Sequence, residues 1–222
     1  MLDIQGLTLG YRGTPVVTDA SLHIERGNAA AITGRSGSGK SSLLAAILGM
    51  VTPLSGTITV DGTDVASLRG RAHREYLRTK VSMIFQHSEL IEELTPIENV
   101  TVPALLAGID KQAATSRAEH LLAHFEVPGD GRPTSVLSGG EKQRLGVARA
   151  LVTQPVLVLA DEPTGSLDAE FRDRVADAIL TLPAQWDCAL LIVTHDPALA
   201  ARADTRYELV PTGTGSELRP VR

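Results

Sequence analysis

The chain carries two kinds of apolar pattern, and each predicts a different kind of β-strand. Near the N-terminus, apolar and polar residues alternate over Leu2 to Tyr11, Val16 to Ile24 and Thr57 to Val60. Gly-containing turns separate these stretches, which predicts half-buried antiparallel strands. Continuous apolar runs are instead typical of central strands in a parallel sheet that helices cover on both faces. Such runs occupy Ala29 to Thr33, Val81 to Phe85, Val156 to Ala160 and Ala189 to Thr194.

Helical patterns lie between the strands. The first, Lys40 to Leu48, is followed by Gly49 as a C-terminal cap. The stretch from about His87 to Val136 has helical patterns and no strand signal, so it predicts a helical insertion in an α/β core. The last residues, Pro211 to Arg222, are predicted to be a loose tail. The remaining predicted helices are Arg71 to Thr79, Ala113 to Phe125, Glu141 to Val152 and Ala169 to Leu182.

Bulk composition narrows the function. The 222 residues carry a net charge of −5, which argues against a nucleic-acid partner or an anionic lipid surface. No apolar run approaches the ~18 residues that span a bilayer, so we expect no direct membrane insertion. The opening residues Met1 to Ile4 alternate like a strand and lack the pattern of a signal peptide. The lone Cys188, in an apolar run, is expected to be a buried thiol in a reducing cytosol.

A glycine-rich segment follows the apolar run Ala29 to Thr33 and opens a predicted helix. Its glycines let backbone N–H groups turn toward phosphate oxygens, and the helix N-terminus adds positive potential. Lys40 is expected to hold the β- and γ-phosphates of ATP, and Ser41 to offer its hydroxyl to Mg²⁺. The segment matches the P-loop pattern and reads Gly34-Arg35-Ser36-Gly37-Ser38-Gly39-Lys40-Ser41.

Two carboxylates end the apolar run Val156 to Ala160. The carboxyl end of a parallel strand is where ligands bind in folds of this kind. Asp161 is therefore expected to reach Mg²⁺, and Glu162 to polarise the attacking water. Together with the P-loop, this predicts a P-loop NTPase core with an N-terminal antiparallel β lobe and an inserted α-helical subdomain.

A third segment, Leu137-Ser138-Gly139-Gly140-Glu141, lies just upstream of the carboxylate strand. By itself Ser-Gly-Gly-Glu is an ordinary helix N-cap with an acidic residue in the first turn. In a P-loop protein and in this order, however, it resembles the LSGGE signature of the ABC ATPase family. The resemblance implies one ABC ATPase domain over 1–222, with the ATP-binding core at about 1–86 and 154–222 and a helical signature subdomain at about 87–153.

The resemblance also implies roles for residues that mean little alone. Tyr11 is similar to the aromatic residue that stacks on adenine, and Gln86 to the glutamine that senses Mg²⁺ and the γ-phosphate. Ser166-Leu167-Asp168 resembles the D-loop, and His195 the switch histidine. Ser42 stands where the family usually has Thr, and Arg35 fills a variable position.

A dimer and a membrane partner follow from the same resemblance. Nothing in the P-loop or the carboxylate strand closes over the γ-phosphate, so a second copy is expected to do so head to tail. The residues expected to act in trans are Ser138, Gly139, Gly140, Glu141 and Asp168. The segment Glu92 to Val102 is expected to fill the helical lobe or to receive a cytoplasmic helix of a membrane permease. The subunit would then sit peripherally on the cytoplasmic face of the inner membrane.

The pattern Leu94-Thr95-Pro96-Ile97-Glu98-Asn99-Val100 resembles the subgroup that serves macrolide export, lipoprotein release, antimicrobial-peptide resistance and hemin efflux. The leading interpretation is an exporter motor of this subgroup, and the alternative is a cell-division ATPase that signals to cell-wall hydrolases. Soluble repair and translation ATPases carry coiled coils or tandem domains, which this chain lacks. The substrate site belongs to the membrane subunit; Arg-rich composition (17 Arg, four Lys) leads us to place hemin slightly ahead of a peptide or a macrolide.

Overall fold

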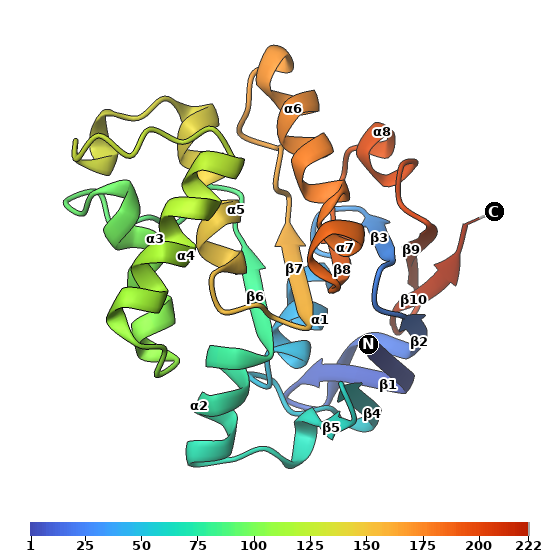
Figure 1. Cartoon of the computed structure of the whole chain (residues 1–222). Helices are drawn as coiled ribbons and strands as arrows, with labels where there is room; N and C mark the ends of the chain where they lie inside the picture. Colours follow the sequence, from blue (N-terminus) through green and yellow to red (C-terminus); the bar gives the residue numbers. More distant parts are fainter. Residues whose placement is uncertain (222) are drawn as a thin grey trace.

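The computed structural model describes residues 1–221, apart from the side chains of residues 169 and 170. Its strands form one ten-stranded sheet in the order β5-β4-β1-β2-β10-β9-β3-β8-β7-β6 (Figure 1). The strands are β1 (Leu2–Tyr11), β2 (Thr14–Ile24), β3 (Ala29–Gly34), β4 (Ser55–Val60), β5 (Thr63–Asp64), β6 (Val81–Ile84), β7 (Leu157–Asp161), β8 (Ala189–Val193), β9 (Thr205–Thr212) and β10 (Gly215–Pro220). The helices are α1 (Lys40–Ile47), α2 (Gly70–Thr79), α3 (Pro96–Leu106), α4 (Lys111–His124), α5 (Gly139–Leu151), α6 (Ala169–Leu180), α7 (Leu182–Trp186) and α8 (Pro197–Ala200), with 3₁₀ turns η1 (Val65–Ser67) and η2 (Thr134–Val136).

The four continuous apolar runs form four of the five strands in the parallel half of the sheet, as predicted, and β9 is the fifth. Strands β9, β3, β8, β7 and β6 pair in parallel in that order. Every residue of β8 is buried, and so are the first four of β7, because helices cover both faces. The fold is therefore α/β with a P-loop NTPase core.

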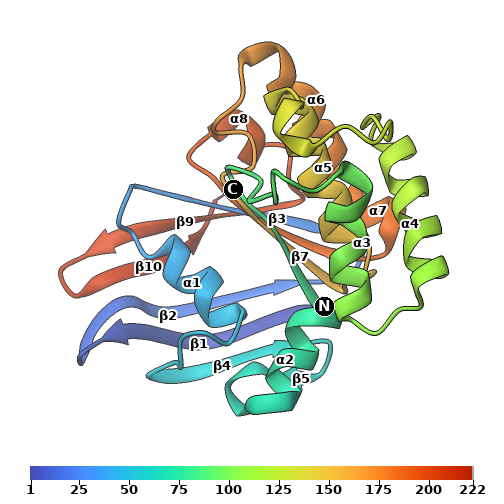
Figure 2. The same ribbon diagram turned by 90° about the vertical axis from the view of Figure 1, so that its left-hand side faces the viewer.

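The alternating N-terminal stretches form the antiparallel half. β1 pairs antiparallel with β2 and with β4, and its buried positions alternate on either side of a register shift between Ile4 and Leu7. This half is continuous with the parallel half because β10 joins β2. Helix α1 lies over the face where the two halves meet, and its residues Leu43, Leu44 and Ile47 share one apolar cluster with both (Figure 2).

The prediction of a loose tail over Pro211 to Arg222 is wrong for its described part; Arg222 lies outside the described residues. Residues 205–220 form the antiparallel hairpin of β9 and β10, and β10 runs beside β2 with Ser216 opposite Val17. Gly215 makes this approach possible, because a Cβ there would lie 3.2 Å from the Val16 carbonyl oxygen at a φ of 139°. β10 is stabilised by pairing with β2, which lies near the other end of the chain. The local sequence of β10 therefore does not predict the strand.

The predicted helix Ala169 to Leu182 is also divided in two. Helix α6 ends at Leu180, and α7 begins at Leu182 with Pro183 in its first turn. Proline lacks the N–H that would continue the ladder of α6, whereas the first turn of a new helix needs none.

Helices α3, α4 and α5 lie together beside the β6 edge (Figure 1). They occupy the predicted helical stretch 87–153, all of which is described and contains no strand. One apolar cluster joins them to the sheet through residues such as Ile84 and Val158. We therefore propose that this stretch and the sheet belong to a single domain. Among the described residues, no helix is long and apolar enough to cross a membrane.

Candidate functional site

The glycine-rich segment leaves β3 at Gly34 and enters α1 at Lys40, as its pattern requires. Gly37 and Gly39 have φ of 78° and 100°, and a Cβ on Gly39 would lie 2.6 Å from the Val17 side chain. Only glycine fits there without strain. Gly39 has no side chain to cap α1, so the N–H groups of the first turn of this helix remain for a ligand.

Lys40 is folded over this loop. Its Nζ donates to the carbonyl oxygens of Gly34, at 2.7 Å, and Arg35, at 3.1 Å. Arg35, Ser36 and Gly37 are exposed at the rim, whereas Ser38 is buried below them. The arrangement presents one ammonium group and a row of backbone N–H groups to the same space, which suits a polyphosphate.

Tyr11 stands beside the start of α1. Its side chain is at the end of β1, is half exposed (51%), and its hydroxyl lies 3.2 Å from the Ser42 Oγ. An exposed aromatic ring next to the P-loop helix offers a flat apolar surface for a nucleobase. The structure therefore places Tyr11, Ser42 and the P-loop together.

Glu162 is held in place by the end of β8. Its Oε2 accepts hydrogen bonds from the Thr194 Oγ1 and the His195 backbone N–H, both at 3.1 Å, and lies 2.8 Å from the His195 Nδ1. Its backbone has a φ of 47° and its N–H donates to the Val193 carbonyl oxygen. The carboxylate is mostly buried (16% exposed), whereas the His195 side chain is open to solvent (70% exposed). The structure thus joins the predicted pair Glu162 and His195, and Thr194 is an added partner that the sequence analysis missed.

Asp161 ends β7 in a setting that favours a cation. Burial first, and then the neighbouring charge of Glu162, raise the pKa of Asp161, while Lys40 opposes both. Asp161 and Ser41 line the same cavity of about 410 Å³. A carboxylate and a hydroxyl are hard oxygen ligands of the kind that Mg²⁺ takes together with phosphate oxygens, so these residues fit that ion.

Gln86 follows β6 and lies against the segment before α6. Its backbone carbonyl oxygen accepts a hydrogen bond from the Ser166 Oγ at 2.8 Å. A Cβ added to Gly165 would come within 3.1 Å of the Gln86 Nε2, so the two segments are in close contact. Asp168 is the N-terminal cap residue of α6 and is exposed, and among the described residues its side chain accepts no hydrogen bond from that helix.

The segment Ser138 to Glu141 begins α5, and its two end residues form a capping box. The Ser138 Oγ accepts from the Glu141 N–H, and the Glu141 carboxylate accepts from the Ser138 N–H at 2.7 Å. These hydrogen bonds lower the pKa of Glu141. Ser138 and Gly139 are exposed, whereas Gly140 is buried against the Phe171 ring. No described hydrogen bond joins this segment to the P-loop, and the cavities that P-loop residues line contain none of it.

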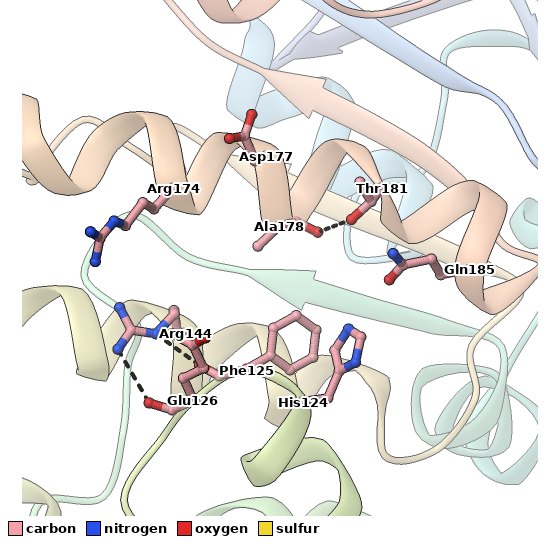
Figure 3. A pocket seen from close by; sticks show the side chains of 9 residues that line it. All are labelled: His124, Phe125, Glu126, Arg144, Arg174, Asp177, Ala178, Thr181 and Gln185. Atoms are coloured by element: carbon pink, nitrogen blue, oxygen red, sulfur yellow. Dashed lines mark hydrogen bonds between the residues drawn. The ribbon is translucent and has the colours of Figure 1, made fainter.

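A separate cavity of about 490 Å³ lies between α4–α5 and α6–α7 (Figure 3). Its lining includes Phe125, Arg144 and Asp177 but none of the predicted site residues. Volume alone therefore does not locate the site in this chain. The assembled groups do: a phosphate loop after a buried strand, with carboxylates at the end of a neighbouring strand, define the chain as a P-loop nucleotide-binding protein.

Comparison with known proteins narrows this class. Residues 17–165 match the ABC transporter family. The chain is 40% identical over 210 residues to the lipoprotein-releasing system ATP-binding protein LolD of Chromohalobacter salexigens, covering 92% of this chain and 88% of that one. It is 42% identical to LolD of Treponema pallidum, with coverage of 87% and 86%, and 36% identical to the ABC transporter ATP-binding protein YtrE of Bacillus subtilis, with coverage of 94% of both.

Solved structures of ATP-binding cassettes are also similar to this chain. A dimeric, post-hydrolysis ATP-binding cassette, MJ0796 bound to ADP and Pi, is similar with a TM-score of 0.84 and 27% identity over 100% of this chain and 99% of that one. The chain belongs to the ABC transporter ATP-binding family. It is an ATP-hydrolysing cassette, and its similarity to LolD proteins matches the subgroup that the sequence predicted, which includes macrolide export, lipoprotein release and hemin efflux.

Proposed function

We propose that this chain is the motor of a transporter that releases a lipid-anchored or similarly amphiphilic cargo from a membrane. Two LolD proteins at 40% and 42% identity support lipoprotein as the cargo. None of the relatives named above refers to hemin, so the compositional preference for hemin has no support. The motor would act from the cytoplasmic face, bound to an integral membrane permease.

One observation supports the mechanism: among the described residues, the P-loop and the segment Ser138 to Glu141 share neither a hydrogen bond nor a cavity. The P-loop helix has an uncapped N-terminus, and the exposed Ser138 and Gly139 lie at the start of another helix. A head-to-tail dimer would bring Ser138 and Gly139 of each copy over the ATP of the other, with Gly140, Glu141 and Asp168 behind them. The related MJ0796 cassette is dimeric.

Within each copy the residues have separate tasks. Lys40 and the N–H groups of the P-loop bind the phosphates of ATP, and Tyr11 packs on the adenine. Ser41, Gln86 and Asp161 would hold Mg²⁺, which supplies charge neutralisation at the β- and γ-phosphates. Glu162 accepts a proton from the attacking water, and His195 contacts the γ-phosphate.

The cargo is tested by reconstitution. The chain and its permease are placed in liposomes that carry a fluorescent lipoprotein, and release is followed after ATP is added. We expect ATP-dependent release of the lipoprotein and no stimulation of the ATPase by hemin. Hemin-stimulated hydrolysis without lipoprotein release would contradict the proposed cargo.

Replacement of His195 by Ala is expected to lower the rate of ATP hydrolysis by about 10²-fold, since a group that acts only at the reacting phosphate contributes to rate and not to binding. ATP affinity should change by less than about threefold. The rate is measured by phosphate release and the affinity with a fluorescent ATP analogue. His23→Ala is a matched control, because His23 is exposed on β2 and pairs with Asp3. Lost binding with a normal rate per bound ATP would make His195 a binding or folding residue.

The proposed permease contact differs from the segment Glu92 to Val102 that the sequence suggested. Val100 is fully buried in the apolar cluster, and Ile97 packs against it, so these side chains fill the helical lobe. Glu92 is engaged with Lys142 at 2.9 Å. Ile91 (48% exposed) and Glu93 remain open on the surface. We therefore place the contact at Ile91 and Glu93.

Glu93→Lys is expected to weaken the complex with the permease by about tenfold, because a charge at the rim of an interface is reversed. The basal ATPase of the isolated subunit should stay unchanged. The complex is quantified by co-purification from detergent, with Glu119→Lys on α4 as a control of equal charge change. Equal loss of complex in both variants, or none in either, would contradict this surface.

A further inference from the structure

The loop that carries Gln86 is strained. It comprises residues 85–89 and is called here the Gln86 loop. Ser88 and Glu89, consecutive and neither of them glycine, have φ of 60° and 45°. Non-glycine residues in this left-handed region persist only where surrounding contacts impose the conformation. Something outside the loop must therefore hold it.

Helix α5 makes those contacts with three residues on one face. It packs beside the end of β6 (Figure 1). Gln143, Gly146 and Arg149 follow one another at three-residue intervals, so they share a face of the helix. A Cβ on Gly146 would lie 3.4 Å from the Ser88 Cβ, so the loop rests directly on the helix at this point.

Gln143 forms hydrogen bonds with Phe85 and Ser88 of the Gln86 loop. Its Nε2 donates to the Phe85 carbonyl oxygen at 3.0 Å, and its Oε1 accepts from the Ser88 Oγ at 2.5 Å. The carbonyl can only accept, so the orientation of the amide is fixed by its partners. Gln143 is 1% exposed. One buried side chain thus spans Gln86 from the residue before it to the second residue after it.

Arg149 forms hydrogen bonds with the end of the Gln86 loop, at Ser88 and Glu89. Its guanidinium donates to the carbonyl oxygens of Ser88, at 2.5 Å, and of Glu89. Two N–H groups of a rigid fork on consecutive carbonyls fix the backbone direction where both residues are left-handed. Arg149 is partly buried, and this burial lowers the pKa of its guanidinium.

We infer that Gln143 and Arg149 are positioning residues that hold Gln86 and couple its position to the helix that carries Ser138. The inference rests on the proposed role of Gln86 in holding Mg²⁺. Helix α5 begins at the segment proposed to cover the ATP of the partner copy, and the same helix holds the Gln86 loop of its own copy. A shift of Gln86 toward the nucleotide is therefore transmitted to Ser138 through two side chains.

The first test uses the chain without nucleotide. Gln143→Met keeps an unbranched side chain of similar size but removes both hydrogen bonds. Arg149→Lys keeps the charge but loses the fork. In each variant, hydrogen exchange of the Ser88 and Glu89 amides should quicken about tenfold, because buried partners of the loop are lost. Arg144→Lys is the control: its guanidinium contacts the carbonyls of Phe125 and Glu126 instead (Figure 3) and should leave the exchange at 88 and 89 unchanged.

The second test separates positioning from general stability. Gln143→Met should lower kcat about tenfold and raise the Mg²⁺ concentration for half-maximal hydrolysis, while ATP binding in the absence of Mg²⁺ is unchanged. In a Gln86→Ala background, Gln143→Met should not lower kcat any further, because the side chain that Gln143 positions has been removed. Thermal unfolding of each variant, with Arg149→Lys as the second variant, detects a folding defect.

The outcomes distinguish the two proposals. If Gln143→Met lowers kcat by the same factor with and without the Gln86 side chain, the role of Gln143 is structural. The inference then fails, while the proposed role of Gln86 stands. Unchanged exchange at 88 and 89 in both α5 variants would overturn it as well. If Gln86→Ala itself leaves kcat and the Mg²⁺ dependence unchanged, the proposed role of Gln86 fails, and the inference fails with it.

Discussion

Glu162→Gln is expected to lower the steady-state rate of ATP hydrolysis by about 10²-fold or more, which is the usual scale for loss of a general base. The amide has nearly the shape of the carboxylate, so the contact with the Thr194 hydroxyl and the His195 N–H can persist through the remaining carbonyl oxygen. What disappears is the proton acceptor. The binding of ATP, assigned to the P-loop and Tyr11, should be unaffected.

The same variant is expected to accumulate as an ATP-bound dimer, because hydrolysis is the step proposed to release the two copies. Phosphate release gives the rate, and size-exclusion chromatography with and without ATP gives the dimer fraction. Glu25→Gln, at an exposed carboxylate that lies beside His23 just after β2, serves as the matched control. A Glu162→Gln protein that hydrolyses ATP normally would falsify the assignment.

Local patterns predicted most of the sheet, and the reason is visible in its burial. β7 and β8 are covered on both faces, and β1 on one, so their sequences follow the two simple rules of continuous and alternating apolar residues. β9 and β10 follow neither rule cleanly. They gain their pairing from β3 and β2, which lie far away in the sequence.

The site divides in the same way. The P-loop, Asp161, Glu162, His195 and Gln86 could be proposed as site residues from the sequence, because their residue types and their order match a family pattern. Gln143 and Arg149 could not, because their partners are backbone and hydroxyl atoms of the Gln86 loop some 55 to 61 positions earlier. Their only local signal is their spacing on one face of α5, which core packing produces equally well.

We propose that each ATP site is built from two copies of the chain. This arrangement predicts that two inactive variants restore hydrolysis when they are mixed. Lys40→Ala removes the ammonium group from the P-loop, and Ser138→Arg places a bulky cation where the segment would cover the partner's ATP. Each variant alone should lose hydrolysis by about 10²-fold or more, since every site in either homodimer is defective. Thermal unfolding checks that both chains are folded.

Mixing the two variants should restore part of the activity. In a head-to-tail mixed dimer, the site with the altered P-loop also faces the altered Ser138, so one site carries both defects and the other carries none. Random mixing of equal amounts makes about half of the dimers mixed, so recovery approaches about a quarter of the normal rate if the intact site works independently. Coupling between the sites would lower this value, so ATP-driven dimerisation is measured in the same samples by light scattering. The unmixed variants at the same total concentration are the controls. If each chain contained a complete site, mixing would restore nothing and the rate per chain would not depend on protein concentration; that result would overturn the shared-site arrangement.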